Sequence, residues 1–432
     1  GAGDDTILGD NQASTLSGGA GKDDITGGTK ADTINGGDGD DTLQGSTASV
    51  GNYDTVSGGA GKDTFKYDDA ELTKEVTLDG GDGADTLSIQ DLSAVADAQL
   101  TGVTSIETLT SAATGLSATL GAEAAEAGIT TVTLAGTNTG GVADSVTIAK
   151  EFSASTITVK MDALNDDGNA DDSNTVDASA YTGSVTFSAA AATAIRGAAG
   201  QASNEAIITG GTGTGDVLST VGATYSAAHL QGVTAIETYT VSDDATASFT
   251  LHNNNAADGK TLTVDGRAIV DTAKTFAVDA SNDTDGIITV HGSAGVDTLT
   301  GSASDNGDTL YGYGGADNFV FAAANLTKLD TIDGGVGDDT VKIATGTTVD
   351  ADFTNVTNIE ALTFTGATTA TLGAEYSESG SATITLTTGT NSVTMDKVTT
   401  DQTVVAVAGT DTIDASDMTK SLTLKIAEDS VR

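Results

Sequence analysis

Aspartates recur every nine residues near the beginning of the chain. Between Gly18 and Gly45 the sequence reads GGAGKDDITGGTKADTINGGDGDDTLQG, in which Asp23, Asp32 and Asp41 each follow a glycine-rich turn. Carboxylates stacked on successive turns repel one another by about 1–4 kcal/mol per neighbouring pair, for an effective dielectric of 80 down to 20. A hard divalent cation turns this repulsion into attraction, and Ca²⁺ accepts about six to eight oxygen ligands. The spacing therefore predicts a row of calcium sites.

These aspartates belong to the repeat G-G-x-G-x-D-x-U-x, in which U is a large apolar residue. Complete copies, or copies with one departure, occupy residues 18–26, 27–35, 36–44, 58–66, 80–88, 292–300, 312–320 and 334–342. Lys30 replaces the third glycine of the second copy, and Gln12 does so in an earlier turn. A single G-x-D segment is ordinary turn chemistry, but several copies that return late in the chain indicate a dedicated site.

The repeat predicts a parallel β-roll in which two nonapeptides make one coil, with coils about 4.8 Å apart. The U side chains, among them Ile25, Ile34, Leu43, Val56 and Phe65, are expected to fill a thin core. Alternate turns then stack on opposite edges. The first edge carries Asp5, Asp23, Asp41, Asp63 and Asp85, and the other carries Ser14, Asp32, Asp54 and Val76. In the later block Asp297, Asp317 and Asp339 share one edge, opposite Asp308 and Asp330. Because Ser14 and Val76 supply no carboxylate, we expect the first edge to bind calcium more completely.

A second, longer repeat divides the chain into modules. The segments VTSIETLT, VTAIETYT and VTNIEALT place Glu107, Glu237 and Glu360 shortly after nonapeptide-like turns, the middle of which has decayed around Asp216. These glutamates either bridge to the neighbouring turn or are solvated acids on a strand, and the same alternatives hold for Asp177, Asp279 and Asp414 in recurring D-A-S segments. The repeats indicate a β-roll at 1–90, β-rich modules at 91–196 and 197–291, a second β-roll at 292–345 and a third β-rich module at 346–432.

Composition excludes several classes of protein. With 62 acidic and 17 basic residues among 432, the formal charge of −45 has the wrong sign for nucleic acid or an anionic membrane. Cysteine and proline are absent, so no disulfide or thiolate site exists. No apolar run approaches the roughly 20 residues of a membrane span, so we expect no membrane insertion. The chain begins inside a glycine turn and ends in a module that the earlier copies continue, so we expect it to be part of a longer protein.

Secondary structure is expected to be almost entirely β. Segments such as TVTLAG, ITVKM, SVTFSA and TLTVDG alternate apolar and polar residues with period two. The alanine-rich stretches 91–100 and 121–128 are expected to form one or two helical turns. The predicted fold class is an all-β, right-handed parallel β-roll or β-solenoid, with calcium-binding turns interleaved with solenoid or sandwich-like strand modules.

At the nonapeptides the sequence resembles the RTX (repeats-in-toxin) calcium-binding β-rolls. With its modular I-E and D-A-S strands it also resembles bacterial surface-layer proteins that carry RTX repeats. The resemblance implies that the sixth-position aspartate supplies side-chain oxygens and that carbonyls around the first, third and fifth positions supply the rest. Carried over to this sequence, those carbonyls belong to Gly18, Ala20 and Lys22; Gly36, Asp38 and Asp40; Gly58, Ala60 and Lys62; and Gly80, Asp82 and Ala84.

The resemblance also implies several bound Ca²⁺ ions, type I secretion, calcium-triggered folding outside the cell and self-assembly. The implied partners are further copies of the chain and, through a region outside this piece, a cell-surface polysaccharide. No enzyme is expected, because His229, His252 and His291 are scattered and no H-E-x-x-H, G-x-S-x-G or Walker segment occurs. The sequence leaves two alternatives to a surface layer: a repetitive adhesin, or the non-catalytic β-roll of a secreted enzyme.

Overall fold

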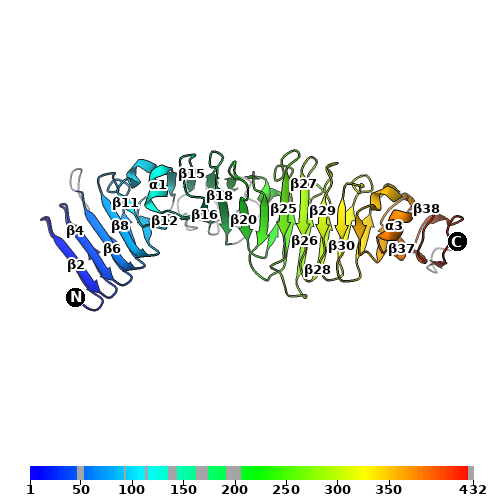
Figure 1. The fold of residues 1–432 in the computed structure, drawn as a ribbon, viewed down its shortest axis with the longest axis horizontal. Coiled ribbons are helices and arrows are strands. Elements are labelled where there is room, and N and C mark those ends of the chain that lie inside the picture. The colour runs from blue at the N-terminus through cyan, green and yellow to red at the C-terminus, as the bar shows by residue number, and fades with distance from the viewer. Residues whose placement is uncertain are drawn as a thin grey trace. The chain divides into compact units, whose positions relative to one another are not determined.

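The computed structural model describes residues 1–45, 53–91, 94–111, 115–134, 144–161, 174–190 and 206–426. The chain forms two compact units, Gly1–Leu218 and Ser219–Arg432. Each unit is built from parallel strands joined by short turns (Figure 1). The predicted all-β parallel solenoid is therefore confirmed. The sequence boundary between residues 196 and 197 lies outside the described residues.

In the first unit, consecutive strands alternate between sheets, so that the chain winds into coils. Thr6 pairs with Asp24 and Thr15 with Thr33, each 18 residues later, which confirms that two nonapeptides make one coil. From Thr33 to its partner Thr55 the coil lengthens to 22 residues, because four residues are inserted.

The strands of the first unit belong to three sheets. One sheet contains β1 (Thr6–Leu8), β3 (Asp24–Thr26), β5 (Thr42–Gln44), β7 (Thr64–Tyr67), β9 (Thr86–Ile89), β12 (Thr108–Ser111), β14 (Thr131–Leu134), β16 (Thr156–Met161) and β18 (Ser184–Ala189), and β20 (Val217–Thr220) follows it. The second contains β2 (Thr15–Ala20), β4 (Thr33–Asp38), β6 (Thr55–Gly61), β8 (Thr77–Gly83) and β11 (Val103–Thr104). The third contains β10 (Ala94–Val95), β13 (Ser117–Leu120), β15 (Ser145–Ile148), β17 (Thr175–Asp177) and β19 (Ile207–Thr209).

The second unit repeats this plan. In this unit one sheet contains β23 (Thr238–Val241), β25 (Thr261–Asp265), β27 (Ile287–His291), β29 (Thr309–Tyr311), β31 (Thr331–Asp333) and β34 (Val356–Thr357), and β22 (Val233–Thr234) lies outside this sheet. Facing these are β21 (Thr224–Tyr225), β24 (Ala247–Thr250), β26 (Thr275–Asp279), β28 (Val296–Thr300), β30 (Asn318–Phe321), β32 (Thr340–Ile343), β35 (Ala361–Phe364), β37 (Thr383–Leu386), β39 (Gln402–Ala406) and β41 (Leu422–Ile426). A four-stranded sheet contains β33 (Gly346–Val349), β36 (Thr368–Leu372), β38 (Thr390–Met395) and β40 (Thr410–Asp414).

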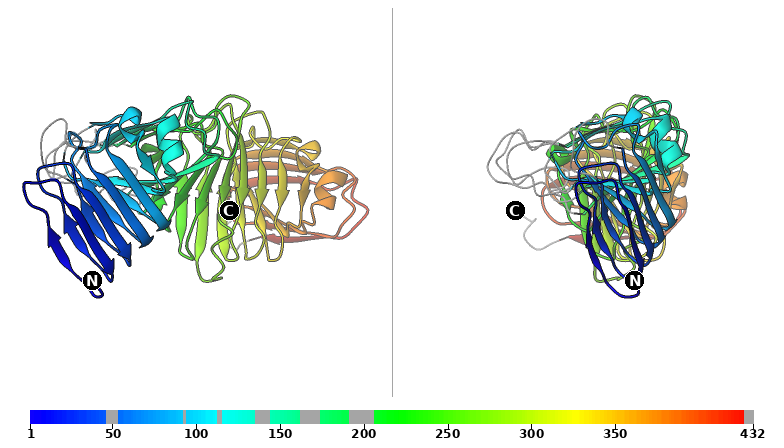
Figure 2. Two further views of the ribbon diagram at one scale, coloured as in Figure 1. Left: turned by 60° about the vertical axis from the view of Figure 1, so that its left-hand side comes forward. Right: turned by 90° about the vertical axis from the view of Figure 1, so that its left-hand side faces the viewer.

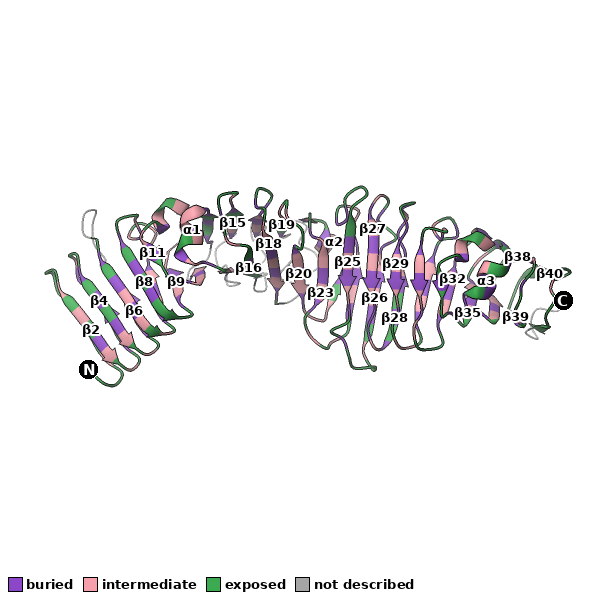
Figure 3. Ribbon diagram, viewed as in Figure 1, coloured by how far each residue is buried: buried purple, intermediate pink, exposed green. Residues whose placement is uncertain are grey.

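Rows of aligned apolar side chains form the core. In the first unit Ile25, Leu43, Phe65 and Leu87 lie in register on successive coils, and all four are fully buried. Figure 3 shows that buried and accessible residues alternate along many of the strands, as period-two patterning requires. The register stacks equivalent residues of every coil above one another, so the turns between strands must stack as well.

Short helices occur where the alanine-rich segments predicted them. The 3-10 helix η1 (Asp97–Leu100) and α1 (Ala122–Ala127) lie beside the strands of the first unit (Figure 2). The second unit contains α2 (Ala227–Leu230), η3 (Asp350–Phe353) and α3 (Ala374–Glu378). Among the described residues, no helix has the length and apolarity needed to cross a membrane.

Candidate calcium sites

Acidic side chains of the first unit form a continuous row of hydrogen bonds along one edge. The backbone N–H of each acidic residue donates to the carboxylate of the next coil: Asp5 to Asp23 (2.7 Å), Asp23 to Asp41, Asp41 to Asp63 and Asp63 to Asp85 (2.8 Å each), and Asp85 to Glu107 (2.7 Å). We call these six residues the first ladder. It joins the five aspartates that the sequence analysis assigned to one edge, and it ends in a glutamate of the I-E strand.

The second unit contains an equivalent row, the second ladder, made of Asp297, Asp317, Asp339 and Glu360. Asp297 N–H donates to Asp317 (2.9 Å), Asp317 N–H to Asp339 (2.8 Å) and Asp339 N–H to Glu360 (2.7 Å). Each hydrogen bond occupies the carboxylate Oδ1 or Oε2 atom. The other carboxylate oxygen of each aspartate takes no part in these hydrogen bonds.

In six ladder aspartates that other oxygen, Oδ2, is buried and has no hydrogen-bond partner in the structure. The six are Asp23, Asp41, Asp63, Asp85, Asp317 and Asp339, each at most 1% exposed. Leaving such an atom unpaired costs free energy, and the cost is larger when the group is charged. An oxygen that is buried, anionic and unpaired is the donor that a hard cation requires.

Asp32, Asp308 and Asp330 on the opposite edge differ, because a backbone N–H of their own turn donates a hydrogen bond to the Oδ2 atom. Asp32 Oδ1 accepts the N–H of Ser14, and its Oδ2 accepts the N–H of Gly28, both at 2.7 Å. In the second unit the Oδ2 atoms of Asp308 and Asp330 accept the N–H groups of Ser302 and Thr327, both at 2.6 Å. The same pairing occurs at two predicted residues away from this edge: Asp297 Oδ2 accepts from Ser293 N–H, and Asp216 Oδ2 from Gly211 N–H. These aspartates therefore have no free Oδ2 to offer.

The conformation of the second residue of the turn separates the two groups. In all six turns with an unpaired Oδ2 this residue has a positive φ, between 68° and 118°: Gly19, Gly37, Gly59, Gly81, Tyr313 and Gly335. In the turns of Asp32 and Asp297 it does not, and there its N–H donates to Oδ2. The left-handed conformation, which glycine adopts readily, thus withdraws the N–H that would otherwise occupy the carboxylate.

The first glycine of each turn leaves the carboxylate room. A Cβ added to Gly36 would overlap Asp41 Oδ2 and would lie 2.7 Å from the carbonyl oxygen of Gly58, on the next coil. Gly58 stands in the same relation to Asp63 Oδ2 and to the carbonyl of Gly80, and Gly312 to Asp317 and Gly334. A carboxylate oxygen and a carbonyl oxygen from successive coils therefore converge beside a glycine, and these are ligand types that Ca²⁺ binds.

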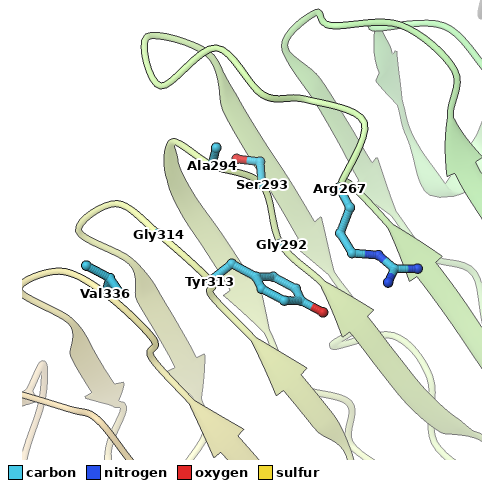
Figure 4. Close-up of a pocket in the computed structure, with 7 residues that line it drawn as sticks. All are labelled: Arg267, Gly292, Ser293, Ala294, Tyr313, Gly314 and Val336. Atoms are coloured by element: carbon cyan, nitrogen blue, oxygen red, sulfur yellow. The ribbon is translucent and has the colours of Figure 1, made fainter.

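Figure 4 shows residues of three successive turns in the second unit. Gly292, Ser293 and Ala294 belong to one turn, Tyr313 and Gly314 to the next, and Val336 to the third. Together with Arg267 they line a shallow hollow on the protein surface. Tyr313 is notable because a tyrosine takes the left-handed position that glycine holds in the other turns.

Burial and neighbouring charges raise the pKa of several ladder carboxyls. Desolvation, reinforced by the charges of Asp85, Asp41 and Asp40, raises the pKa of Asp63 to about 6 against the opposing effect of the Asp41 N–H. Desolvation, together with Asp297 and Asp339, raises the pKa of Asp317 to about 8. In the absence of a cation the fold therefore disfavours the charged form that it encloses.

Most of the other residues predicted as calcium ligands form backbone hydrogen bonds with neighbouring coils. The carbonyls of Ala20, Asp38 and Ala60 each accept a backbone N–H from Gly3, Gly21 and Gly39, which leaves one lone pair on each oxygen. The N–H groups of Lys22 and Lys62 donate to Asp4 and Asp40 on the preceding coil. Asp5 is partly exposed, whereas Asp54 is buried and accepts the Asp32 N–H at 2.8 Å.

No three histidine, aspartate or glutamate side chains converge as a metal cluster within the described part of the chain. A cation held by a ladder would therefore take carboxylate oxygens from at most two coils and would take its other ligands from backbone carbonyls or water. The unpaired oxygens and the spaces beside the glycines fit a calcium ion of this kind.

The D-A-S aspartates have a local role that the sequence left open. Asp177, Asp279 and Asp414 each accept the N–H of the serine two residues later, at 2.9–3.0 Å. This hydrogen bond, with the serine hydroxyl, lowers the pKa of Asp177 and Asp414. In all three modules the aspartate thus closes the turn that follows its strand.

Comparison with protein-family models finds the RTX calcium-binding nonapeptide repeat (4 copies) at residues 1–29, 17–47, 76–88, 291–325 and 329–342. These ranges include every ladder aspartate with an unpaired oxygen except Asp63. The comparisons with curated proteins and with solved structures found no match. The chain therefore carries RTX calcium-binding repeats on a parallel β-solenoid, and such repeats are typical of secreted proteins.

Proposed function

We propose that this chain is a calcium-dependent structural protein that folds on Ca²⁺ outside the cell. In this proposal it is not an enzyme, and it assembles with copies of itself into a bacterial surface layer or a related extracellular lattice or fibre. Export by a type I system and attachment to a cell-surface polysaccharide, through a region outside this chain, belong to the same proposal.

The observation that carries the proposal is the position of the unpaired carboxylate oxygens. They lie inside stacked turns, on side chains that are at most 1% exposed. A calcium ion bound there would be enclosed between coils, where a substrate could not reach it. Its role would then be to hold the coils together.

The energetics support calcium-dependent folding. Ordering each residue of a glycine-rich turn costs about 1–2 kcal/mol, and the core beneath the first ladder consists of only one or two buried apolar side chains per strand. A ligand that binds only the folded form stabilises that form by mass action. Extracellular calcium modules bind at about 10⁻⁴–10⁻³ M, so a site of this class would fill after export.

Two features support self-assembly in calcium. Bound calcium reduces the formal charge of −45, which otherwise makes copies of the chain repel one another. Tyr313 and Val336, which are 43% and 79% exposed, place apolar side chains on adjacent turns over the second ladder. Calcium would thus both order these turns and lessen the repulsion between copies.

Negative-stain electron microscopy of the purified chain, with and without millimolar calcium, tests the proposal. Ordered sheets or filaments are expected in calcium only. Val336→Asp should reduce assembly without loss of bound calcium, whereas Leu329→Asp, which alters a 56% exposed residue of the same unit, should not. Monomeric rods in calcium would contradict assembly and would favour an adhesin extender.

A further inference from the structure

We propose that the last calcium site of each ladder is completed by a glutamate of the I-E strand and not by a second nonapeptide turn. Glu107 closes the first ladder and Glu360 closes the second. The inference rests on the calcium binding proposed above, and it assigns ligands outside the repeat.

The hydrogen bonds place these glutamates in the role of a ladder aspartate. Asp85 N–H donates to Glu107 Oε2, and Asp339 N–H donates to Glu360 Oε2, both at 2.7 Å. Within the first ladder the aspartate-to-aspartate bonds have the same direction and nearly the same length. The two copies lie in different units, so the arrangement occurs twice independently.

The carbonyl that a following turn would supply is also present. A Cβ added to Gly80 would overlap the carbonyl oxygen of Ser105 and lie 2.6 Å from Asp85 Oδ2. In the second ladder, Gly334 stands in the same relation to Asn358 and Asp339. Ser105 and Asn358 therefore bring a carbonyl oxygen to the place that a glycine carbonyl takes in the inner coils.

The backbone explains how residues other than glycine achieve this. Ser105 and Asn358 have φ values of 56° and 55°, in the left-handed region. Two residues later the strand bulges, since the N–H groups of Glu107 and Thr108 both donate to the carbonyl of Asp85, at 3.2 and 3.0 Å. Glu360 and Ala361 donate to Asp339 in the same way, both at 3.0 Å. A bulge displaces the side chain that follows it, and the longer glutamate reaches the position that aspartate reaches from a regular turn.

An unpaired oxygen points to a ligand at both places. Asp85 Oδ2 and Asp339 Oδ2 are buried without a partner, and both residues are fully buried. The adjoining glutamates are more accessible, Glu107 being half-buried and Glu360 exposed. An ion bound here would thus be more open to solvent than one bound between two buried aspartates.

The ladders end at these residues. The coil after Glu107 presents Thr130 at the equivalent position, and the coil after Glu360 presents Ala382. Neither residue has a carboxylate.

The third copy of the motif is an internal comparison. Glu237 lies in VTAIETYT, but the aspartate of the preceding turn, Asp216, has both oxygens occupied. Its Oδ1 accepts the N–H of Val185 at 2.8 Å and its Oδ2 that of Gly211 at 2.6 Å. We therefore expect no calcium site at Glu237, although its local sequence is nearly the same.

Calcium bound per chain, measured by equilibrium dialysis with radioactive calcium, tests the inference. Glu107→Gln and Glu360→Gln should each lose about one ion, and the double variant about two, because an amide oxygen is a neutral and weaker ligand. Glu237→Gln should bind as much calcium as the parent chain. Glutamine retains an acceptor for the Asp85 or Asp339 N–H, so the far-UV circular dichroism in calcium should be unchanged.

The outcomes separate this inference from the proposed function. If the parent chain binds calcium and both glutamine variants bind equally much, the terminal sites do not exist, while the ladder sites stand. If the parent chain binds no calcium, the proposed function fails. If Glu107→Gln does not fold, Glu360→Gln decides the question in the other unit.

Discussion

Replacing Asp41 by asparagine should change the stability of the first unit in opposite directions with and without calcium. Asp41 lies in the middle of the first ladder, with Asp23 and Asp63 on the neighbouring coils. Its Oδ2 is buried and unpaired, while its Oδ1 accepts the Asp23 N–H, a bond that asparagine can keep. The substitution therefore removes a charge and leaves the packing nearly unchanged.

In chelator the substitution should be stabilising. At a coil spacing of about 4.8 Å, two unit charges repel by about 0.9 kcal/mol in a dielectric of 80 and about 3.5 kcal/mol in one of 20. Asp41 has two such neighbours, so its neutralisation relieves about 2–7 kcal/mol. The raised pKa of Asp41, caused by desolvation and by the charges of Asp23 and Asp40 against the Asp23 N–H, has the same direction.

In calcium the substitution should be destabilising. Asp41 borders the spaces toward both neighbouring coils, so its carboxylate would serve up to two ions. A site at a free calcium concentration one hundred times its Kd contributes about 2.7 kcal/mol, so two lost sites cost about 5 kcal/mol. The relief of repulsion no longer applies, because the ions had already compensated it.

Asp32→Asn is the matched control on the opposite edge. Asp32 is equally buried, but its oxygens accept the N–H groups of Ser14 and Gly28. Its substitution loses one charge-assisted hydrogen bond, worth about 1.5–3 kcal/mol, and the effect should be the same in calcium and in chelator.

Because the chain is expected to lose much of its β-structure in chelator, two titrations followed by far-UV circular dichroism compare the variants: urea unfolding in calcium, and refolding by the osmolyte TMAO in chelator, with bound calcium measured in parallel. The expected signature is a calcium-dependent difference for Asp41→Asn and none for Asp32→Asn. Equal calcium loss in the two variants, or destabilisation by Asp41→Asn in chelator, would falsify the assignment of the first ladder as the calcium-binding edge.

Three further predictions concern glycine, chelation and pH. Gly36→Ala should lose calcium, because its Cβ would overlap Asp41 Oδ2, whereas Gly314→Ala, whose Cβ would find its nearest atom at 3.7 Å, should retain it in the same dialysis assay. Chelation should abolish much of the β-signal in far-UV circular dichroism, and an unchanged spectrum would contradict calcium-dependent folding. Desolvation raises the pKa of Asp144 to about 6 against backbone N–H bonds from Leu116 and Gly115. The folded state then binds more protons than the unfolded one, so stability falls as pH rises from about 4 to about 6, by about 3 kcal/mol. Asp144→Asn should reduce the pH slope of the urea unfolding free energy by this amount, and an unaltered slope would contradict the pKa assignment.

The periodic features of the fold were predictable from the sequence. Two nonapeptides per coil, the apolar row through Ile25 and Leu43, and the grouping of ladder aspartates on one edge all follow from the nine-residue spacing. Regular repeats bring equivalent residues into register, so a sequence period becomes a spatial row. The helical turns near residues 97 and 122 were predictable from local composition alone.

The roles of Glu107 and Glu360 could not be decided from the sequence. Each immediately precedes a strand, β12 or β35, in a segment without the glycine turn, and its place in the ladder depends on a bulge and on a left-handed serine or asparagine two residues earlier. Serine rarely takes that conformation, and asparagine takes it more often than most residues but far less readily than glycine. The near-constant interval between Asp85 or Asp339 and the following glutamate was the available signal, since it equals one coil.

Aspartates in turns of similar sequence differ in whether the Oδ2 atom accepts a hydrogen bond, so the motif alone does not specify a calcium ligand. Gly27 and Gly28 precede Asp32 as a pair of glycines precedes Asp41, yet Gly28 donates its N–H to Asp32, in a turn where Lys30 replaces the third glycine. The turn of Asp297 keeps that third glycine, but Ser293 donates both its N–H and its hydroxyl to the carboxylate. Tyr313, by contrast, replaces a glycine and still adopts the left-handed conformation, and Asp317 Oδ2 stays free. We therefore expect a calcium-competent turn to meet two conditions: a glycine at the fourth position, and a second residue that does not itself bond the carboxylate. By those conditions Asp317 and Asp339 should bind calcium in the second unit, whereas Asp297, which has the same motif and lies on the same edge, should contribute at most Oδ1.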